Sequence, residues 1–325
     1  MTTTSDTTII GMGGSPYATE SLDGPIPFHR VRDLFDFTVG HAPVFTMQHG
    51  VPTEVPGRHA LVRTDTEAVL NVTSKRYGIH QFSDVLIDNL LTLTDSSDGD
   101  LEVLGAGLLK RGAVGWAQVK APTMRIAGDD LAPIITLASS HDGSLATSYR
   151  TGMFRFACSN QVPALRSTRG NVYKLKHTQN SHMRFEDARH VLGLMWNVAD
   201  DFAAEVAALI DTAVTDRQFT EIVERLNPRP VGESVAPAAV TRWENNADAL
   251  RTMWTEDERV APYRGTAWGA VQAFSTHRQW ERMTRTTVET GPMTRAGRQM
   301  QDLLNGRLAS SERQYVAAVR DVVAA

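Results

Sequence analysis

The stretch LEVLGAGLLKRGAVGWAQVK, Leu101 to Lys120, carries a strong strand signal. Two largely apolar runs, Leu101–Lys110 and Ala113–Lys120, flank the dipeptide Arg111-Gly112. Short apolar runs on either side of a glycine-containing turn are typical of paired strands. The stretch therefore predicts an antiparallel β-hairpin.

A second antiparallel hairpin is predicted shortly downstream. Pro133–Ser139 and Leu145–Ala157 flank the sequence His141-Asp142-Gly143-Ser144. Asp-Gly tolerates the positive φ angles that tight hairpin turns require, so the turn chemistry is stronger here than in the first hairpin. Asn171–His177 has the composition of one further strand.

Upstream of the hairpins, short strands and helices are predicted. Runs with β-type composition cover residues 43–48, 59–64 and 68–77, and helical spacing covers residues 82–93. Residues 1–25 carry Thr, Ser, Gly and Pro with little apolar periodicity, so we expect a mobile arm there.

After about residue 181 apolar residues recur every three to four positions almost to the end of the chain. This spacing predicts a first long amphipathic helix over about 182–226, which ends at Asn227-Pro228. Thr241 with Glu244 fits a capping box for the next helix, which contains Trp243, Leu250 and Trp254.

Strands and helices are therefore segregated along the chain, which disfavours a doubly wound parallel sheet. We predict an α+β fold with three parts. These are a mobile arm at 1–25, an α+β core at 26–180 and a helical region at 181–325. The core is an antiparallel β-hairpin sheet with a helix, and the C-terminal region is mostly helical.

Composition excludes several classes of protein. The 325 residues include one cysteine, Cys158, which can form neither an intramolecular disulfide nor a Cys-rich zinc site. No apolar run approaches the roughly 20 residues that span a bilayer, and residues 1–8 lack the pattern of a signal peptide. We expect a cytoplasmic protein without membrane contact.

Common catalytic motifs are missing from the sequence. None of the five lysines follows a glycine, which excludes a Walker P-loop, and the zincin and hydrolase-elbow motifs are also absent. The run Gly11-Met12-Gly13-Gly14 lies in the predicted arm without a preceding strand, which disfavours a dinucleotide cradle. We expect no nucleotide hydrolysis and no cofactor, and leave enzymatic activity open.

Charge is segregated along the chain. From Gly143 to Phe185 there is no Asp or Glu in 43 residues, although the whole chain carries a net charge of −4. The same window holds seven cations and is therefore +7, while the other 282 residues sum to −11. Aromatic residues are interleaved with these cations.

Cations that neutralise phosphates, beside rings on which bases stack, are the components of a groove for single-stranded nucleic acid. The predicted phosphate ligands are Arg150, Arg155, Arg166, Arg169, Lys174 and Lys176. The predicted stacking residues are Tyr149, Phe156 and Tyr173, with Asn160 as a neutral hydrogen-bonding group and the hairpin tip Lys110-Arg111 as an extension. The same residues could instead form subunit contacts, or could pack in the core with each arginine paired to a distant acid.

Four segments together resemble the phage/plasmid-like protein family, whose core is the uncharacterised domain of unknown function 932. They are NVTSKRY at 71–77, IITLASSHDG at 134–143, FACSNQ at 156–161 and HTQNSHMRFEDARHVLG at 177–193. The resemblance covers about residues 65–228. It implies a virus- or replicon-encoded protein in the host cytoplasm and supplies no catalytic residues.

The order of the predicted elements is also similar to that of the Rad52-like single-strand annealing superfamily, whose members form rings that lay DNA along a basic groove. Element order alone does not determine function. The leading hypothesis is a phage-type protein that binds and anneals single-stranded DNA in recombination, as a homo-oligomer, with a phage exonuclease or single-strand-binding protein as a further partner.

Two alternatives to this hypothesis remain. The first is a structural or regulatory phage protein whose basic β surface serves oligomerisation or an acidic protein partner. The second is a metal-dependent nuclease that uses Asp98, Asp100, Asp129 or Asp142, because carboxylates in turns suit hard cations.

Overall fold

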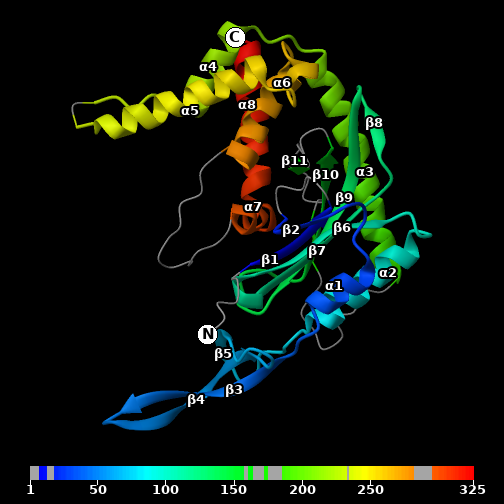
Figure 1. Ribbon diagram of the computed structural model, residues 1–325, viewed down its shortest axis with the longest axis vertical. Coiled ribbons are helices and arrows are strands. Elements are labelled where there is room, and N and C mark those ends of the chain that lie inside the picture. The colour runs from blue at the N-terminus through cyan, green and yellow to red at the C-terminus, as the bar shows by residue number, and fades with distance from the viewer. Residues whose placement is uncertain are drawn as a thin grey trace.

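A computed structural model describes residues 7–12, 18–156, 160–163, 172–174, 185–232, 234–281 and 295–325 of the chain. Its two β-sheets are built from the N-terminal half, and its long helices come from the C-terminal region (Figure 1). The predicted α+β class is therefore confirmed.

The two predicted hairpins form the centre of the larger sheet. Its strand order is β11-β10-β9-β7-β6-β1-β2. The first hairpin pairs β6 with β7, and the second pairs β9 with β10. Arg111 and Gly112, both with positive φ angles, turn the chain between β6 and β7. The four central strands are β6 (Glu102–Leu109), β7 (Val114–Lys120), β9 (Asp129–Ser140) and β10 (Ser148–Arg155).

Two strands within the N-terminal segment correct the expectation of a mobile arm for residues 7–12 and 18–25, while residues 1–6 and 13–17 of the predicted arm lie outside the described residues. Thr8–Met12 forms β1, which pairs antiparallel with β6, and Glu20–Leu22 forms β2 at the edge of the sheet. Ile9 and Ile10 are buried in the core. β1 has only five residues, and Thr, Ser and Gly are frequent around it in the sequence. This run is too short to show strand periodicity, so its pairing depends on the partner strand that the sheet provides.

Short strands complete the other end of the sheet. β8 (Met124–Ile126) pairs with β9, while β11 (Asn160–Pro163) and β12 (Val172–Lys174) both pair with β10. The described part of the predicted strand at 171–177 is β12.

Helices cover both faces of the central strands. α1 (Phe28–Leu34), the π-helical segment Ser83–Asp88, α2 (Asn89–Ser96) and the start of α3 (Phe185–Ile210) pack on one face against Val119, Ile135 and Tyr149. α7 (Arg295–Leu304) packs on the other face against Trp116 and Ala138. Strands buried on both sides have near-continuous apolar sequences, which explains the runs in the two hairpins.

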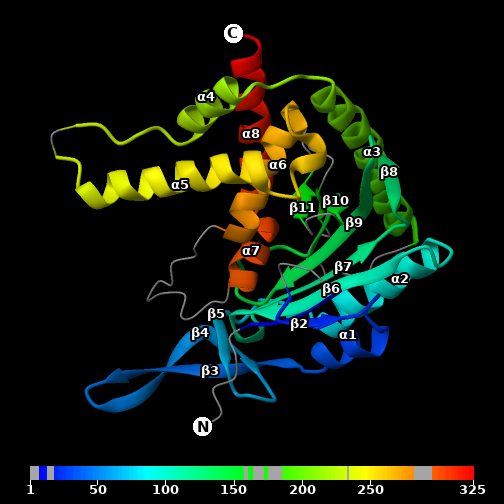
Figure 2. The same ribbon diagram turned by 45° about the horizontal axis from the view of Figure 1, so that its top comes forward.

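A second core forms where the remaining helices meet the β9–β11 end of the sheet. The end of α3, α4 (Asp216–Leu226), α5 (Pro237–Glu256), α6 (Ala267–Thr276) and α8 (Arg307–Val323) enclose Trp254, Trp268 and Phe219. Leu131, Met153 and Val162 join this core from the strands. α5 extends away from the sheet in two views (Figures 1 and 2).

Two helix boundaries differ from the sequence predictions. The helix expected over 182–226 is two helices, because α3 ends at Ile210 and α4 begins at a capping box that Thr215 forms with Gln218. The capping box expected from Thr241 and Glu244 is wrong. α5 begins one turn earlier with Pro237 in its first turn, where a proline ring fits without losing a hydrogen bond.

The smaller sheet has the order β3-β4-β5 and comprises β3 (Val39–Gln48), β4 (Val51–Arg63) and β5 (Val69–Ser74). The three strand runs expected at 43–48, 59–64 and 68–77 lie in it. Its long β3–β4 hairpin projects away from the helices in both views (Figures 1 and 2). Gln81 anchors its base, because the Gln81 amide donates to the Val39 carbonyl oxygen and accepts from the Val39 N–H, both at 2.9 Å. This sheet is called the β3–β5 arm below.

None of the helices in the described ranges combines the length and the apolar character that a membrane span needs.

Candidate nucleic-acid interface

Strand β10 divides the predicted binding residues between two faces of the sheet. Successive side chains of a strand point in opposite directions. Tyr149 and Arg155 therefore share one face, and Arg150 and Phe154 share the other. The neighbouring strands β9, β11 and β12 determine what each face meets.

Tyr149 and Tyr173 lie on a buried face. They are directly opposite each other on β10 and β12, with ring centroids 6.1 Å apart. Tyr149 is only 1% exposed, and burial raises the pKa of its hydroxyl. The half-buried Tyr173 donates a 2.6 Å hydrogen bond to Asp187 Oδ1 and lies 5.5 Å from the ring of His190. The prediction that Tyr149 stacks on bases is wrong, and Tyr173 faces the same core.

Arg155 forms an ion pair inside the protein. Its side chain is fully buried, and its Nε donates to the carboxylate of Asp129. Its Nη1 donates to the carbonyl oxygen of Arg259 at 3.0 Å and to Gln272 Oε1 at 3.4 Å. Arg155 is therefore not a phosphate ligand, and it packs in the core against a distant acid.

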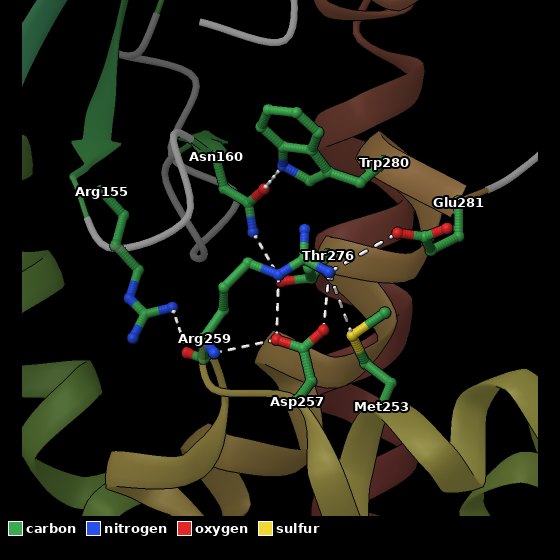
Figure 3. A network of polar contacts seen from close by, with 8 residues as sticks. All are labelled: Arg155, Asn160, Met253, Asp257, Arg259, Thr276, Trp280 and Glu281. Atoms are coloured by element: carbon green, nitrogen blue, oxygen red, sulfur yellow. Dashed lines mark hydrogen bonds and ion pairs between the residues drawn. The ribbon is translucent and has the colours of Figure 1, made fainter. Parts of the chain in front are cut away.

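Asn160 is also buried and joins the sheet edge to the helices. Its Nδ2 donates to Thr276 Oγ1 at 3.0 Å, and its Oδ1 accepts from Trp280 Nε1 at 3.1 Å (Figure 3). The next residue, Gln161, exchanges side-chain hydrogen bonds with Gln118. The prediction that Asn160 contacts nucleic acid is therefore wrong.

Arg259 completes this polar contact between sheet and helices, and no sequence pattern pointed to it. Its guanidinium is 2.6 Å from Asp257 Oδ2 and 3.5 Å from Glu281 Oε1 (Figure 3). Hydrogen bonding to Asp257 raises the pKa of Arg259 and lowers the pKa of Asp257. Its carbonyl oxygen accepts from Arg155, so a local ion pair and a long-range contact meet at one residue.

The hairpin tip at Lys110-Arg111 meets the second hairpin turn. Lys110 Nζ is 2.7 Å from Asp142 Oδ2, and the Arg111 side chain is exposed. Burial opposes ionisation of Asp142, but hydrogen bonds from Lys110 and Ser144 lower its pKa below the ordinary value. The charge of Lys110 is therefore paired with that of Asp142, which counts against a phosphate-binding role.

His141 does not pair with Asp142 for acid–base chemistry. Its ring lies 4.3 Å from the ring of Phe82, and burial lowers its pKa to about 4. Asn71 donates to the His141 carbonyl oxygen at 3.3 Å. His141 is thus a neutral core residue at the junction of the two sheets.

Arg150 and Lys174 remain together on the opposite face. Strand register places Arg150 opposite Val172 and Lys174 opposite Ser148, so the two cations point to the same side of the sheet one residue pair apart. Lys174 is exposed and Arg150 is partly buried. Burial lowers the pKa of Arg150, and among the described residues Arg150 has no ion pair. Its Nε is buried without a hydrogen bond to any of these residues.

Phe156 lies beyond the end of the same strand. Its half-buried ring meets Phe154 edge to face at 5.1 Å, and Phe154 shares the side of the sheet that Arg150 occupies. We call Arg150, Lys174 and Phe156 the Arg150 face. Arg166, Arg169 and Lys176 lie outside the described residues.

Two of the four carboxylates considered for metal binding are in ion pairs, and the described carboxylates do not form a metal-binding cluster. Asp129 pairs with Arg155, and Asp142 pairs with Lys110. Within the ranges that the structure describes, no group of three or more His, Cys, Asp and Glu residues could hold a metal ion.

A known family matches most of the residues that form this architecture. The family model for the domain of unknown function DUF932 matches residues 69–300. The chain belongs to the DUF932 family. The match confirms the resemblance seen in the sequence and extends it well beyond residue 228. No curated protein and no solved structure gives a significant match.

The DUF932 region contains the four central strands, the Arg155–Asp129 pair and the Arg150 face. It begins at β5, so β3 and β4 precede it. The projecting hairpin of this DUF932 protein is thus outside the matched region.

Proposed function

We propose that this DUF932 protein binds single-stranded DNA along the Arg150 face and promotes annealing of complementary strands in host cytoplasm. One observation carries the proposal: Arg150 is a partly buried cation without an acidic partner among the described residues. Desolvating an unpaired charge is costly, and an external anion would offset that cost.

The surroundings of Arg150 suit a polyanion. Arg150 and Lys174 lie in the 43-residue window that contains no Asp or Glu, so no acid within the window competes for them. Three further cations of the window, Arg166, Arg169 and Lys176, adjoin the two strands in sequence. Phe156, on the same side and only half-buried, supplies an aromatic ring for base contact, since stacking on aromatic rings tolerates any base.

Annealing needs no bond-breaking chemistry in this proposal. Cations along one face cancel the repulsion between phosphates of two complementary strands, and an extended bound strand exposes its base edges for pairing. A phage exonuclease that produces single strands, or a single-strand-binding protein that holds them, is the expected functional partner.

The test is a fluorescence-anisotropy titration of a labelled oligonucleotide over a range of salt concentrations. The wild-type protein should bind with an affinity that falls steeply with salt, because binding releases counterions. The variant Arg150→Gln/Lys174→Gln should bind more weakly. Its slope of log affinity against log salt should be shallower by about 1.4, since each lost phosphate contact on a single strand removes about 0.7.

A matched control changes the same charge elsewhere. Arg217 and Arg242 are exposed arginines on α4 and α5, so Arg217→Gln/Arg242→Gln should leave both affinity and salt slope unchanged. If the two double variants bind equally well, the Arg150 face is not the binding site. If the wild-type protein shows no salt-sensitive binding, the proposed function is wrong.

A structural role in assembly is the second candidate, and the exposed β3–β5 arm favours it. A strand-pairing assay with two complementary labelled oligonucleotides separates the candidates. A purely structural protein would not accelerate pairing.

A further inference from the structure

Exposed apolar side chains are concentrated on the β3–β5 arm. Eight large apolar side chains are exposed among the described residues, and five of them belong to this small sheet. Three lie near the tip of the β3–β4 hairpin: Phe45 at 58%, Met47 at 65% and Val51 at 62% exposed. The other two, Val69 and Val72, are on β5. Scattered single apolar residues are normal on a surface, but a cluster marks an interaction site.

Strand register places the apolar residues of the arm on more than one side. Phe45 and Met47 share a side with Glu54 and Pro52, which are directly opposite them, whereas Val51 is opposite Gln48 and points to the other side. Nearer the base of the arm, apolar residues are paired across the three strands. Ala42, Ala60 and Val72 are directly opposite one another across β3, β4 and β5, and Val62 is opposite Val69. Residues opposite each other in antiparallel strands point to the same side. The adjacent positions, such as Leu61 and Asn71, point to the body of the protein, where Leu61 is buried.

The outer half of the hairpin is a two-stranded ribbon. β5 pairs with β4 only from Arg58 inwards, so beyond Gly57 the β3–β4 pair has no third strand among the described residues. An isolated ribbon of this kind is marginal in water by itself, and its edges offer unpaired backbone groups to a partner.

Three cations lie together where this ribbon joins β5. Arg58 is opposite Ser74, and the N–H of Lys75 donates to the Gly57 carbonyl oxygen at 3.0 Å, which places Lys75 and Arg76 beside Arg58. All three side chains are exposed and have no ion pair within the described part of the chain. A partner for the arm should therefore combine apolar and acidic groups.

The chain itself carries such a surface. Residues 77–109 contain six acidic residues and no Lys or Arg. Asp84, Asp88, Leu91 and Asp95 are exposed and recur at spacings of four, three and four residues along the Ser83–Asp88 segment and α2. This spacing places them on one side of the helix, with an exposed leucine among three carboxylates. We call these four residues the α2 stripe.

The arm of one molecule does not lie over the α2 stripe of the same molecule. The outer end of the β3–β4 hairpin and α2 are on different sides of the molecule in both views (Figures 1 and 2). Complementary surfaces that are apart on one chain can meet between two chains.

We propose that the β3–β5 arm of one copy of this protein docks on the α2 stripe of a second copy. Phe45 and Met47 contact the region of Leu91, while Arg58, Lys75 and Arg76 face the carboxylates. The contact joins two different surfaces, so it is heterologous and repeats from copy to copy. It produces a closed ring or an open filament according to the rotation between neighbours.

Complementation between two variants tests this contact. An arm variant, Phe45→Ser/Met47→Ser, keeps its α2 stripe, and a stripe variant, Asp84→Lys/Asp95→Lys, keeps its arm. Light scattering after size-exclusion chromatography should show that the wild-type protein assembles and that each variant alone is monomeric. An equimolar mixture should form 1:1 dimers, because one intact arm then meets one intact stripe and no chain can extend further.

A variant with swapped charges on the arm and the α2 stripe separates loss of the contact from misfolding. The chain with Arg58→Glu/Lys75→Glu and Asp84→Lys/Asp95→Lys together should assemble again. The control Asp200→Lys/Asp201→Lys changes exposed acids on α3 and should assemble as the wild type does.

Several outcomes overturn the proposal. They are a monomeric wild-type protein at the highest soluble concentration, an arm variant with the wild-type mass, or a mixture that remains monomeric. An arm variant with unchanged mass but without oligonucleotide binding would show that the arm contacts nucleic acid instead. The proposed function fails separately, because its test measures binding by Arg150 and Lys174, which the assembly variants do not alter.

Discussion

Arg150 and Arg155 lie five residues apart on one strand and have opposite surroundings. Arg155 is fully buried, pairs with Asp129 and donates to the backbone of Arg259. Arg150 is only partly buried and has no ion pair within the described residues, although burial lowers its pKa. In the sequence both are equivalent cations of an acid-free stretch. The comparison shows that the face of the strand decides whether a cation of the window is structural or available.

The partners of the two arginines explain the difference. Arg155 meets α6 and the loop before it, whose residues lie more than a hundred positions away. Arg150 points to the other side, where Thr136 and Val172 are its cross-strand neighbours. An arginine beside neutral groups keeps its charge available to an external anion, whereas an arginine beside a carboxylate does not.

The largest expected effect concerns the paired arginine. Arg155→Met leaves the Asp129 carboxylate buried without its partner, so the free energy of unfolding should fall by about 3–5 kcal/mol. Urea denaturation followed by circular dichroism measures it. The control Arg155→Met/Asp129→Leu removes both charges and should recover most of the loss. A single variant as stable as the wild type would contradict the structural role of the pair.

Glu312 is a buried acid without an ion pair among the described residues, and its protonation should make the free energy of unfolding depend on pH. It is completely buried and accepts a 2.6 Å hydrogen bond from Ser275, and burial raises its pKa to about 7. The folded protein keeps the proton that the unfolded chain releases above pH 4.5. The free energy of unfolding should therefore fall by about 3 kcal/mol as the pH rises from about 4.5 to 7.

The variant Glu312→Gln should abolish this contribution to the pH dependence. Denaturant titrations at several pH values measure it, with Glu256→Gln on the surface of α5 as the control. An unchanged pH profile in Glu312→Gln would mean that Glu312 is ionised in the folded protein.

His141 provides the opposite slope in the other core. Burial lowers the pKa of His141 to about 4. Below pH 6.5 the unfolded chain therefore binds a proton at His141, whereas the folded protein does not bind it until the pH is near 4. The free energy of unfolding should fall by roughly 3 kcal/mol as the pH decreases from 6.5 towards 4. His141→Phe should remove this loss, because the ring packs against Phe82. The control is His49→Phe at the exposed hairpin tip, and a persistent acid slope in His141→Phe would contradict the assignment.

The smallest effect on stability is expected at the unpaired arginine. Arg150→Met removes a desolvated charge that has no partner among the described residues, so the free energy of unfolding should change by less than about 1 kcal/mol or increase. The same variant should lose affinity for oligonucleotides in the anisotropy titration. A large loss of stability in Arg150→Met would show that Arg150 resembles Arg155, and the comparison would fail.

Sequence patterns predicted most of the architecture because they depend on local properties. The two hairpins follow from apolar runs and from turn residues such as Asp142-Gly143, and the helical region follows from spacing of three to four residues. The boundaries were less predictable. Five residues of β1 show no periodicity, and the break after Ile210 became evident only with the cap at Thr215.

The candidate site was predicted in part. Arg150 and Lys174 lie on the same side of the sheet, where Lys174 is exposed and Arg150 is partly buried, whereas Tyr149, Arg155 and Asn160 are inside the protein. Alternation along the strand could have shown that these residues point to different sides, but not what packs against each side at each position. Coverage depends on helices that come from the C-terminal region of the chain.

The sequence by itself determined the α+β class, the hairpins, the membership of the DUF932 family and the segregation of charge. Each of these depends on residue type and local spacing. Only the tertiary structure decided which cations of the acid-free window are neutralised. The reason is physical: Asp129 and the helix that holds Thr276 approach Arg155 and Asn160 through packing of the whole chain, and no pattern within the window encodes that approach.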